Sequence, residues 1–249
     1  VIVNRLWHYY FGQGIVNTPS DFGINGARPT HPELLDWLAT ELVSHNWSLK
    51  HIHRLILMSH TFRQSGVANE RGLANDAANT SLWRFAPRRL EAEVIRDCIL
   101  ATSGALDLRQ GGPGWSPFEP NDNYVRVYTP REQFGPAEWR RMIYATVVRQ
   151  RPDGVFGVFD CPDGGQIAPK RTSSTTPLQA LNLLNSRFIM QQAELFAGRV
   201  RDVRQAFILA FNRMPTPAEL TTAEEFVQAH GMPLFCRALF NANEFVYVF

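Results

Sequence analysis

The stretch Thr176-Pro177-Leu178-Gln179 predicts the start of a helix. It has a hydroxyl residue at the cap, proline in the first turn and glutamine three positions after the cap, which together form a capping box. An apolar stripe follows at helical spacing, through Leu181, Leu184, Phe188 and, after a kink, Phe196. The sequence therefore predicts a long amphipathic helix in this region.

The same signal recurs at Thr216-Pro217-Ala218-Glu219, and Gly231 and Pro233 close the predicted helix. Residues 234–245 predict a terminal helix. Near the start of the chain, apolar residues recur at helical spacing from residue 2 to a stop at Gly12. A helix that begins without a cap favours a chain cut from a longer polypeptide.

Two further helices are predicted in the first third of the chain. Thr30-His31-Pro32-Glu33 reads as a capping box before a stripe that includes Leu38 and Leu42, and Ser48 is expected to cap the next helix. Residues 64–80 are polar and predict an exposed loop. Pro87 introduces a helix that ends near Gly104, with the predicted inner stripe Leu90, Val94, Cys98 and Ala101.

The middle of the chain is rich in glycine, proline and aromatic residues. Residues 105–136 predict an irregular segment, and so long a segment in a compact domain is more often functional than idle. Within it, residues 124–128 alternate like a short strand. Residues 142–148 fit either a strand or a helix that begins at Pro136. The expected fold class is mainly α: a single multi-helix domain over residues 1–249, with long irregular loops and at most a small β element.

The composition excludes several classes of protein. Lys plus Arg number 25 and Asp plus Glu 23, so a net charge of +2 argues against a nucleic-acid partner. No apolar run is long enough for a membrane span. Cys98, Cys161 and Cys236 form neither a zinc spacing nor a haem-attachment motif, so no cofactor is expected in this chain.

The common catalytic and metal motifs are missing from the sequence. Asp21-Phe22-Gly23 imitates the magnesium motif of kinases, but the other kinase motifs do not accompany it, so a turn is favoured. His51 and His53 are two positions apart and point to opposite sides of a helix. His53 and His60 could share a face, but no carboxylate accompanies them. No metal site is therefore predicted.

Charged residues crowd the predicted helix after Pro87. Arg89, Glu93, Arg96 and Asp97 are predicted on one face, as a solvated ladder of ion pairs or as arginines that receive an anionic ligand. Residues 139–171 add further arginines among aromatic residues, and arginine suits bidentate contact with anions. The predicted ligand-binding residues are Arg89, Arg96, Arg140, Arg141, Tyr144, Arg149 and Arg171.

Paired carboxylates could instead carry out glycoside hydrolysis. The candidate catalytic residues are Asp21, His31, Glu93, Asp97 and Asp160, but the sequence does not give their separation.

The order of several motifs resembles one known family. They include Asn4-Arg5-Leu6-Trp7, Arg88-Arg89-Leu90-Glu91-Ala92-Glu93, Gly111-Gly112-Pro113, Thr175-Thr176-Pro177-Leu178-Gln179-Ala180-Leu181 and Arg213-Met214-Pro215-Thr216. Together they resemble a planctomycete-specific C-terminal domain of unknown function, found in large exported proteins that also carry c-type cytochrome modules. The resemblance spans nearly the whole chain.

The resemblance implies a cellular location and neighbouring modules for this chain, but it implies no reaction. It implies that this chain is the C-terminal module of an exported protein, periplasmic or at the cell surface, with a signal peptide and haem c on upstream modules. Its partners would be the neighbouring modules, cytochrome c among them. The family usually has a cysteine-containing or basic stretch before the Thr-Thr-Pro motif. In this chain Gln166-Ile167-Ala168-Pro169-Lys170-Arg171 keeps the basic part and lacks the cysteine, so no disulfide is expected there.

Three functions remain open from the sequence. The leading hypothesis is a non-haem module that binds an anionic or carbohydrate ligand, such as an anionic polysaccharide, or a partner through its arginine and aromatic surface. The alternatives are a polysaccharide-active enzyme and a structural docking platform for neighbouring modules. A docking platform predicts large exposed apolar patches and no enclosed pocket.

Overall fold

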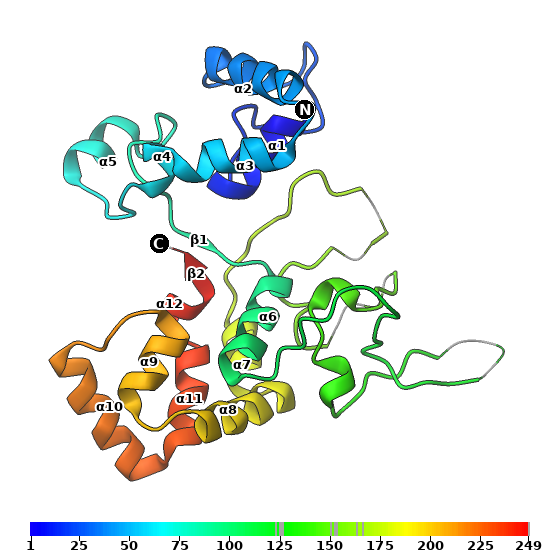
Figure 1. Cartoon of the computed structure of the whole chain (residues 1–249), viewed down its shortest axis with the longest axis vertical. Coiled ribbons are helices and arrows are strands. Elements are labelled where there is room, and N and C mark those ends of the chain that lie inside the picture. Colours follow the sequence, from blue (N-terminus) through cyan, green and yellow to red (C-terminus); the bar gives the residue numbers. More distant parts are fainter. Residues whose placement is uncertain are drawn as a thin grey trace. The chain divides into compact units, whose positions relative to one another are not determined.

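Figure 1 shows the computed structural model, which describes residues 1–122, 124, 127–149, 151, 154–162, 164–165 and 167–248. In this part of the chain the regular structure consists of α-helices, two short 3-10 turns and one two-stranded sheet, so the predicted mainly α fold is confirmed. Backbone contacts divide the chain into two compact units, Val1–Arg88 and Arg89–Val248. That the two units form a single domain stays a prediction.

The first unit is a cluster of helices. They are α1 (Ile2–Phe11), α2 (Pro32–Ser44), α3 (Leu49–Met58), α4 (His60–Arg63) and α5 (Glu70–Asp76). α1, α2 and α3 contact one another, and their buried side chains include Trp7, Leu38 and Ile52. The helices predicted at 2–11, after Pro32 and after Ser48 are thus confirmed.

Asn4 is a fully buried polar residue on α1. Its side-chain Oδ1 accepts the N–H of Val16 at 2.8 Å, and its Nδ2 donates to the Val16 carbonyl at 3.0 Å. A Cβ at position 14 would lie 2.8 Å from the Asn4 Nδ2 and 2.7 Å from the Val16 carbonyl oxygen, so only glycine fits there. Asn4 and Gly14 together fold the connector after α1 back onto that helix.

Two expectations for the first unit are wrong in detail. α2 begins after His31 with no side-chain cap, because the Thr30 hydroxyl donates to the Ile15 carbonyl at 3.3 Å instead. Residues 64–80 contain α5, whose first turn is capped by Asn69 accepting the N–H of Gly72 at 2.7 Å. α5 buries none of its residues, so no apolar stripe predicts it.

The second unit holds the remaining elements. They are α6 (Ala92–Ser103), α7 (Pro177–Asn185), α8 (Arg187–Arg199), α9 (Val203–Phe211), α10 (Pro217–His230), α11 (Met232–Phe240), α12 (Asn243–Val246) and β2 (Tyr247–Val248). β2 forms a two-stranded sheet with β1 (Arg88–Arg89), of which Arg89 belongs to this unit. Both predicted capping boxes, at Thr176 and Thr216, are confirmed. The predicted long helix is two helices, because Ser186 is extended and its hydroxyl caps α8.

The core of the second unit is built around α8, which packs against α6 and α11 (Figure 1). Phe196 of α8 is fully buried and its ring stacks on Phe240 of α11, with 5.5 Å between centroids. Gln192 is also fully buried, and its Oε1 accepts the hydroxyl of Ser103 at 2.6 Å. This core fixes the side of α6 that faces inward.

The observed inner face of α6 differs from the predicted stripe. The helix starts only at Ala92, because Arg88–Arg89 form β1. Ile95 and Ile99 are fully buried, whereas Val94, which was predicted to face inward, is 41% exposed. The predicted end is correct, since Gly104 takes a left-handed conformation with φ of 83°.

The segment after α6 is irregular, as expected. Its described residues from 105 to 135 lie outside every helix and strand and make single bridges such as Trp115 with Ala145. Two 3-10 turns, Pro136–Glu138 and Met142–Tyr144, replace the helix or strand expected at 136–148. The strand expected at 124–128 includes residues 125 and 126, which lie outside the described residues.

The described helices include none with the length and apolar character that a bilayer span requires. The longest, α10, has 14 residues.

The first prediction concerns the core around α8. Phe196→Ala removes a buried ring and should lower the free energy of unfolding by about 3–5 kcal/mol. Leu195→Ala is the matched control, since Leu195 is 38% exposed on the same helix and should cost far less. Urea denaturation of the full chain measures both, and equal losses would contradict this assignment of the core.

Candidate ligand-binding pocket

A cavity of about 410 Å³ lies beside the first turns of α6 in the second unit. It is called the α6 pocket below. Its lining comes from the start of α6, the irregular segment and the loop before α7: Glu91, Glu93, Val94, Asp97, Trp115, Pro117, Phe118, Arg141, Met142, Ile143, Ala145, Thr146, Val147, Val148, Arg151, Cys161, Pro162 and Arg171. Four of the predicted site residues, Glu93, Asp97, Arg141 and Arg171, thus line one cavity.

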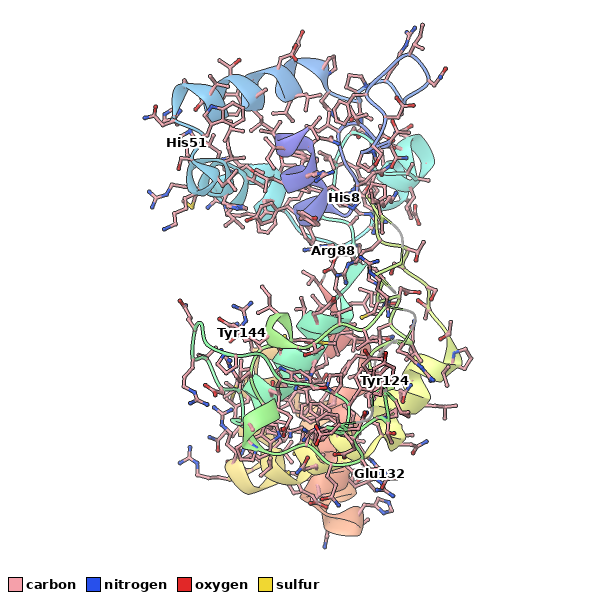
Figure 2. The ribbon with its side chains drawn as sticks, turned by 90° about the vertical axis from the view of Figure 1, so that its right-hand side faces the viewer. His8, His51, Arg88, Tyr124, Glu132 and Tyr144 are labelled. Atoms are coloured by element: carbon pink, nitrogen blue, oxygen red, sulfur yellow. The ribbon has the colours of Figure 1, made fainter. Side chains whose placement is uncertain are left out.

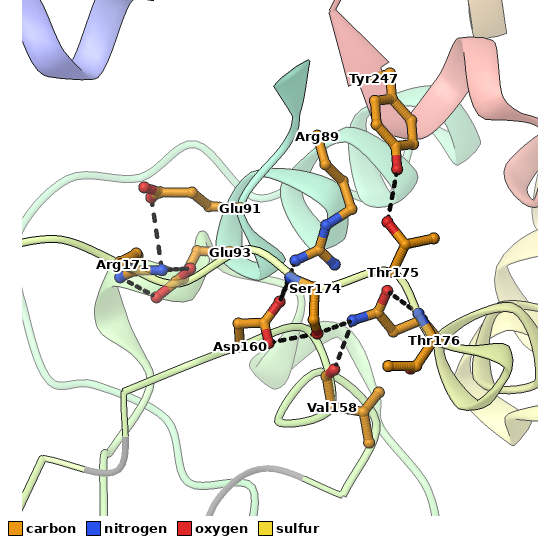
Figure 3. Close-up of polar contacts among 11 residues, drawn as sticks. Arg89, Glu91, Glu93, Val158, Asp160, Arg171, Ser174, Thr175, Thr176 and Tyr247 are labelled. Carbon is orange, nitrogen blue, oxygen red and sulfur yellow. Dashed lines mark hydrogen bonds and ion pairs between the residues drawn. The ribbon is translucent and has the colours of Figure 1, made fainter. Parts of the chain in front are cut away.

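Glu93 and Arg171 form a bidentate ion pair in this pocket (Figure 3). Arg171 Nη1 lies 2.6 Å from Glu93 Oε2, and Nη2 lies 2.8 Å from Oε1. Burial raises the pKa of Glu93, but the hydrogen bonds and charge of Arg171 outweigh it and hold that pKa below the ordinary 4.5. The hydrogen bonds to Glu93 raise the pKa of Arg171. Both groups are therefore charged at neutral pH.

Asp97 lies one helical turn after Glu93 and anchors a different part of the pocket wall. Its Oδ1 accepts the backbone N–H of Met142 at 2.8 Å, and its Oδ2 lies 3.5 Å from Arg141 Nε. The Arg141 side chain is 54% exposed. One side of α6 therefore carries two carboxylates that each hold a loop segment.

Arg96 and Arg140, both predicted ligand-binding residues, are buried. Arg96 donates to the carbonyls of Arg140 at 2.9 Å and Glu138 at 2.6 Å, and its guanidinium lies 4.3 Å from the centre of the Trp115 ring. Arg96 therefore faces the core side of α6, away from the predicted shared face with Glu93. Its hydrogen bonds go to the backbone carbonyls of Glu138 and Arg140, and its Nη1 also lies 3.8 Å from Asp97 Oδ1.

Arg140 holds the glycine-rich turn of the irregular segment. Its guanidinium donates to the carbonyls of Arg109 at 3.0 Å, Gly111 at 2.6 Å and Pro113 at 2.5 Å. Tyr144 supports the same turn: its ring lies 3.8 Å from the Arg140 guanidinium, and its hydroxyl accepts the N–H of Gly111 at 2.9 Å. These contacts give Arg140 and Tyr144 a structural role.

Arg89 and Asp160 form a second charged pair, which lies outside the lining of the α6 pocket (Figure 3). Arg89 Nη2 lies 2.5 Å from Asp160 Oδ2, and Ser174 donates to Asp160 from its backbone N–H at 2.8 Å and its hydroxyl at 2.7 Å. Burial raises the pKa of Asp160, but the Ser174 hydrogen bonds and the Arg89 charge lower it overall. This network ties β1 to the loop before α7.

The other predicted site residues lie elsewhere. Arg149 is exposed and does not line the α6 pocket. Asp21 and His31 belong to the first unit: Asp21 Oδ1 accepts the N–H of Gly23 at 2.8 Å, and His31 Nδ1 lies 2.9 Å from the Thr30 hydroxyl. The Asp21 bond confirms the turn favoured over a kinase motif.

Several lining residues were not among the predicted site residues, although the loop from Gly111 to Tyr128 was expected to form one wall of the site. Trp115 and Phe118 are buried, with 6% and 5% exposure, and belong to the apolar part of the pocket. Their position in the irregular segment was the only signal. Glu91 was also missed, and its carboxylate lies 3.5 Å from Arg171 Nη1.

The chain is a helical protein whose α6 pocket has the volume of a small-molecule site. A family model described as PSD1, a protein of unknown function (DUF1553), matches residues 1–227, and the chain therefore belongs to this family. This agrees with the resemblance to a domain of unknown function. Among curated proteins and among solved structures, none matches the chain.

The structural role of Arg140 can be tested directly. Arg140→Ala leaves three carbonyls without their donor and should lower the free energy of unfolding by about 2–3 kcal/mol. Arg149→Ala, at an exposed arginine of the same region, should change it by less than about 0.5 kcal/mol. Urea denaturation measures both, and a silent Arg140→Ala would contradict this role.

A pH dependence follows from the Glu93–Arg171 pair. The folded pKa of Glu93 is lowered, so its stabilisation is complete above the ordinary pKa of 4.5 and is lost as pH falls through the lowered value. Glu93→Gln should therefore destabilise the chain at pH 7, and the difference from wild type should shrink as pH falls below 4.5. Melting temperatures from pH 7 to pH 3 measure this, with the exposed Glu224→Gln as control. A difference independent of pH would contradict the charged pair.

Proposed function

We propose that the chain is a binding module and that the α6 pocket takes a carbohydrate. The observation that carries the proposal is the balance of charges around the cavity. Among its described lining residues are three carboxylates (Glu91, Glu93, Asp97) and three guanidinium groups (Arg141, Arg151, Arg171). Such a balance favours an uncharged polar ligand over a strongly anionic one.

The chemistry of the lining supports a sugar ring. The half-exposed Arg141 offers N–H donors, and the carboxylates offer acceptors, which suits hydroxyl groups that both donate and accept. Apolar side chains such as Val94, Ile143 and Val147 line the same cavity and suit the C–H faces of a sugar. The volume of about 410 Å³ lies within the usual range of small-molecule sites.

The polysaccharide-active enzyme has weaker support. Glu93 and Asp97 line the same pocket, but the lowered pKa of Glu93 opposes a role as general acid, which requires a raised pKa. The other predicted candidates, Asp21, His31 and Asp160, do not line the pocket. Binding without hydrolysis is therefore the better interpretation.

A docking platform has one observation in its favour. Ile143 and Val147 line the α6 pocket, and each is 74% exposed. Exposed apolar side chains around one cavity are typical of surfaces that contact a partner. The partner would be a neighbouring module of the same polypeptide.

A thermal-shift screen of the full chain tests the carbohydrate proposal. Neutral and sulfated glycans are compared at low and high salt. A ligand at about 100 times its Kd stabilises the folded state by roughly 2.7 kcal/mol. We expect neutral glycans to raise the melting temperature at both salt concentrations. Arg141→Ala should reduce the effect, and Arg204→Ala, at an exposed arginine outside the pocket lining, should not.

Other outcomes separate the alternatives. Stabilisation by sulfated glycans alone, lost at high salt, would replace a sugar site with an anionic-polysaccharide site. Release of reducing ends from a neutral glycan would favour the enzyme. A flat response to all glycans would contradict the proposal and favour docking.

The proposed setting follows from the family resemblance in the sequence. We propose that the chain is a module of an exported planctomycete protein whose upstream modules carry haem c. Haem staining of the full-length protein after cell fractionation tests both points. A haem-free protein found only in the cytoplasm would contradict them.

A further inference from the structure

Glu41, His45 and His51 form a cluster in the first unit. One potential ligand atom from each residue lies within 4.8 Å of the other two. Glu41 lies in the last turn of α2 and His45, four positions later, is the C-cap of that helix, so the two side chains can meet. His51 lies in the first turn of α3.

The turn between α2 and α3 brings the three residues together (Figure 2 labels His51 there). Asn46 and Trp47 both take left-handed conformations, with φ of 54° and 59°. The Trp47 N–H donates to the Leu42 carbonyl at 2.8 Å, which closes the turn. Ser48 then caps α3 by accepting the N–H of His51 at 3.3 Å, so the cap fixes the backbone of His51.

The donor atoms converge on one carboxylate oxygen. His51 Nε2 lies 2.8 Å from Glu41 Oε2, and His45 Nδ1 lies 3.3 Å from the same oxygen. The two imidazole rings stack, with centroids 3.7 Å apart and planes inclined by 12°. Two ring nitrogens and one carboxylate oxygen therefore lie within 4.8 Å of one another at the surface.

We propose that Glu41, His45 and His51 bind a zinc ion, with solvent as the fourth ligand. Two imidazoles and a carboxylate are a ligand set that zinc uses, whereas calcium and magnesium prefer oxygen alone. Tetrahedral bonds of about 2.0–2.1 Å place ligand atoms about 3.4 Å apart. The His45–Glu41 distance of 3.3 Å already fits this, and the His51–Glu41 distance of 2.8 Å must widen slightly.

Binding also requires an adjustment at His45, whose Nδ1 lies 3.0 Å from the Glu41 backbone carbonyl oxygen and 3.1 Å from the Ser44 hydroxyl and must leave both for the ion. The lone pairs of stacked, nearly parallel rings do not converge, so the His45 ring must tilt out of the stack to face the ion. The side chain of His45 is 47% exposed, which leaves room for this rotation. Each imidazole binds in its neutral form, with its proton on the ring nitrogen away from the ion. The ion would then join the end of α2 to the start of α3.

Isothermal titration of Zn²⁺ into the chelator-treated full chain tests the proposal. We expect one ion per chain, and His45→Gln and His51→Gln should each weaken binding at least tenfold. His60→Gln is the matched control, since His60 is an exposed histidine of the same unit and should keep the wild-type affinity. If a histidine variant fails to fold, Glu41→Gln tests the same site and should also weaken Zn²⁺ binding. Circular dichroism checks that each variant keeps its helix content.

A cobalt spectrum separates this site from the three cysteines. Cys98, Cys161 and Cys236 are thiols outside disulfides, and a thiolate ligand would give a charge-transfer band. A Co²⁺ spectrum with d–d bands and without that band supports the proposed ligands. Absence of stoichiometric Zn²⁺ binding, a thiolate band, or variants that bind as tightly as wild type would each overturn the proposal.

Discussion

The buried guanidinium of Arg96 is the contact on which the organisation of the second unit depends. A charge this deeply buried is tolerated only with hydrogen-bonding partners, and Arg96 finds them in the carbonyls of Glu138 and Arg140. The ring of Trp115 lies against the same group. A long segment with little regular structure is thereby attached to α6, and Arg140 continues the pattern by holding the glycine-rich turn.

The directions of the other α6 side chains follow from the position of Arg96. With Arg96 turned toward the irregular segment and Ile95 and Ile99 in the core, Glu93 and Asp97 point to the pocket. Glu93 holds Arg171 from the loop before α7, and Asp97 holds the backbone of Met142. The α6 pocket is therefore formed where two loops are tied to the same helix, and its charged pairs serve the fold as well as any ligand.

The sequence predicted the features that depend only on residues close together in the chain, above all the helix ends. Capping boxes at Thr176 and Thr216, the Ser48 cap and the stop at Gly104 all mark helix ends in the structure. The predicted inner face of α6 was wrong because the charge of Arg96 led to its assignment to the solvent side. The Glu93–Arg171 pair joins residues 78 positions apart, and spacing carries no signal for it. Likewise, the meeting of His51 with Glu41 depends on a left-handed Trp47, a conformation that is rare for a bulky residue.

Hydrogen exchange on the wild type and Arg96→Met tests this organisation most directly. Loss of the guanidinium should remove protection from the amides of Asp107 and Trp115 in the irregular segment and of Thr146, which pairs with it; all three donate to backbone carbonyls. The amides of α8 and α11 should keep theirs, and Arg141→Met, at a half-exposed arginine, should leave both sets unchanged. Unchanged protection in the segment, or an equal loss throughout the second unit, would contradict the central role of Arg96.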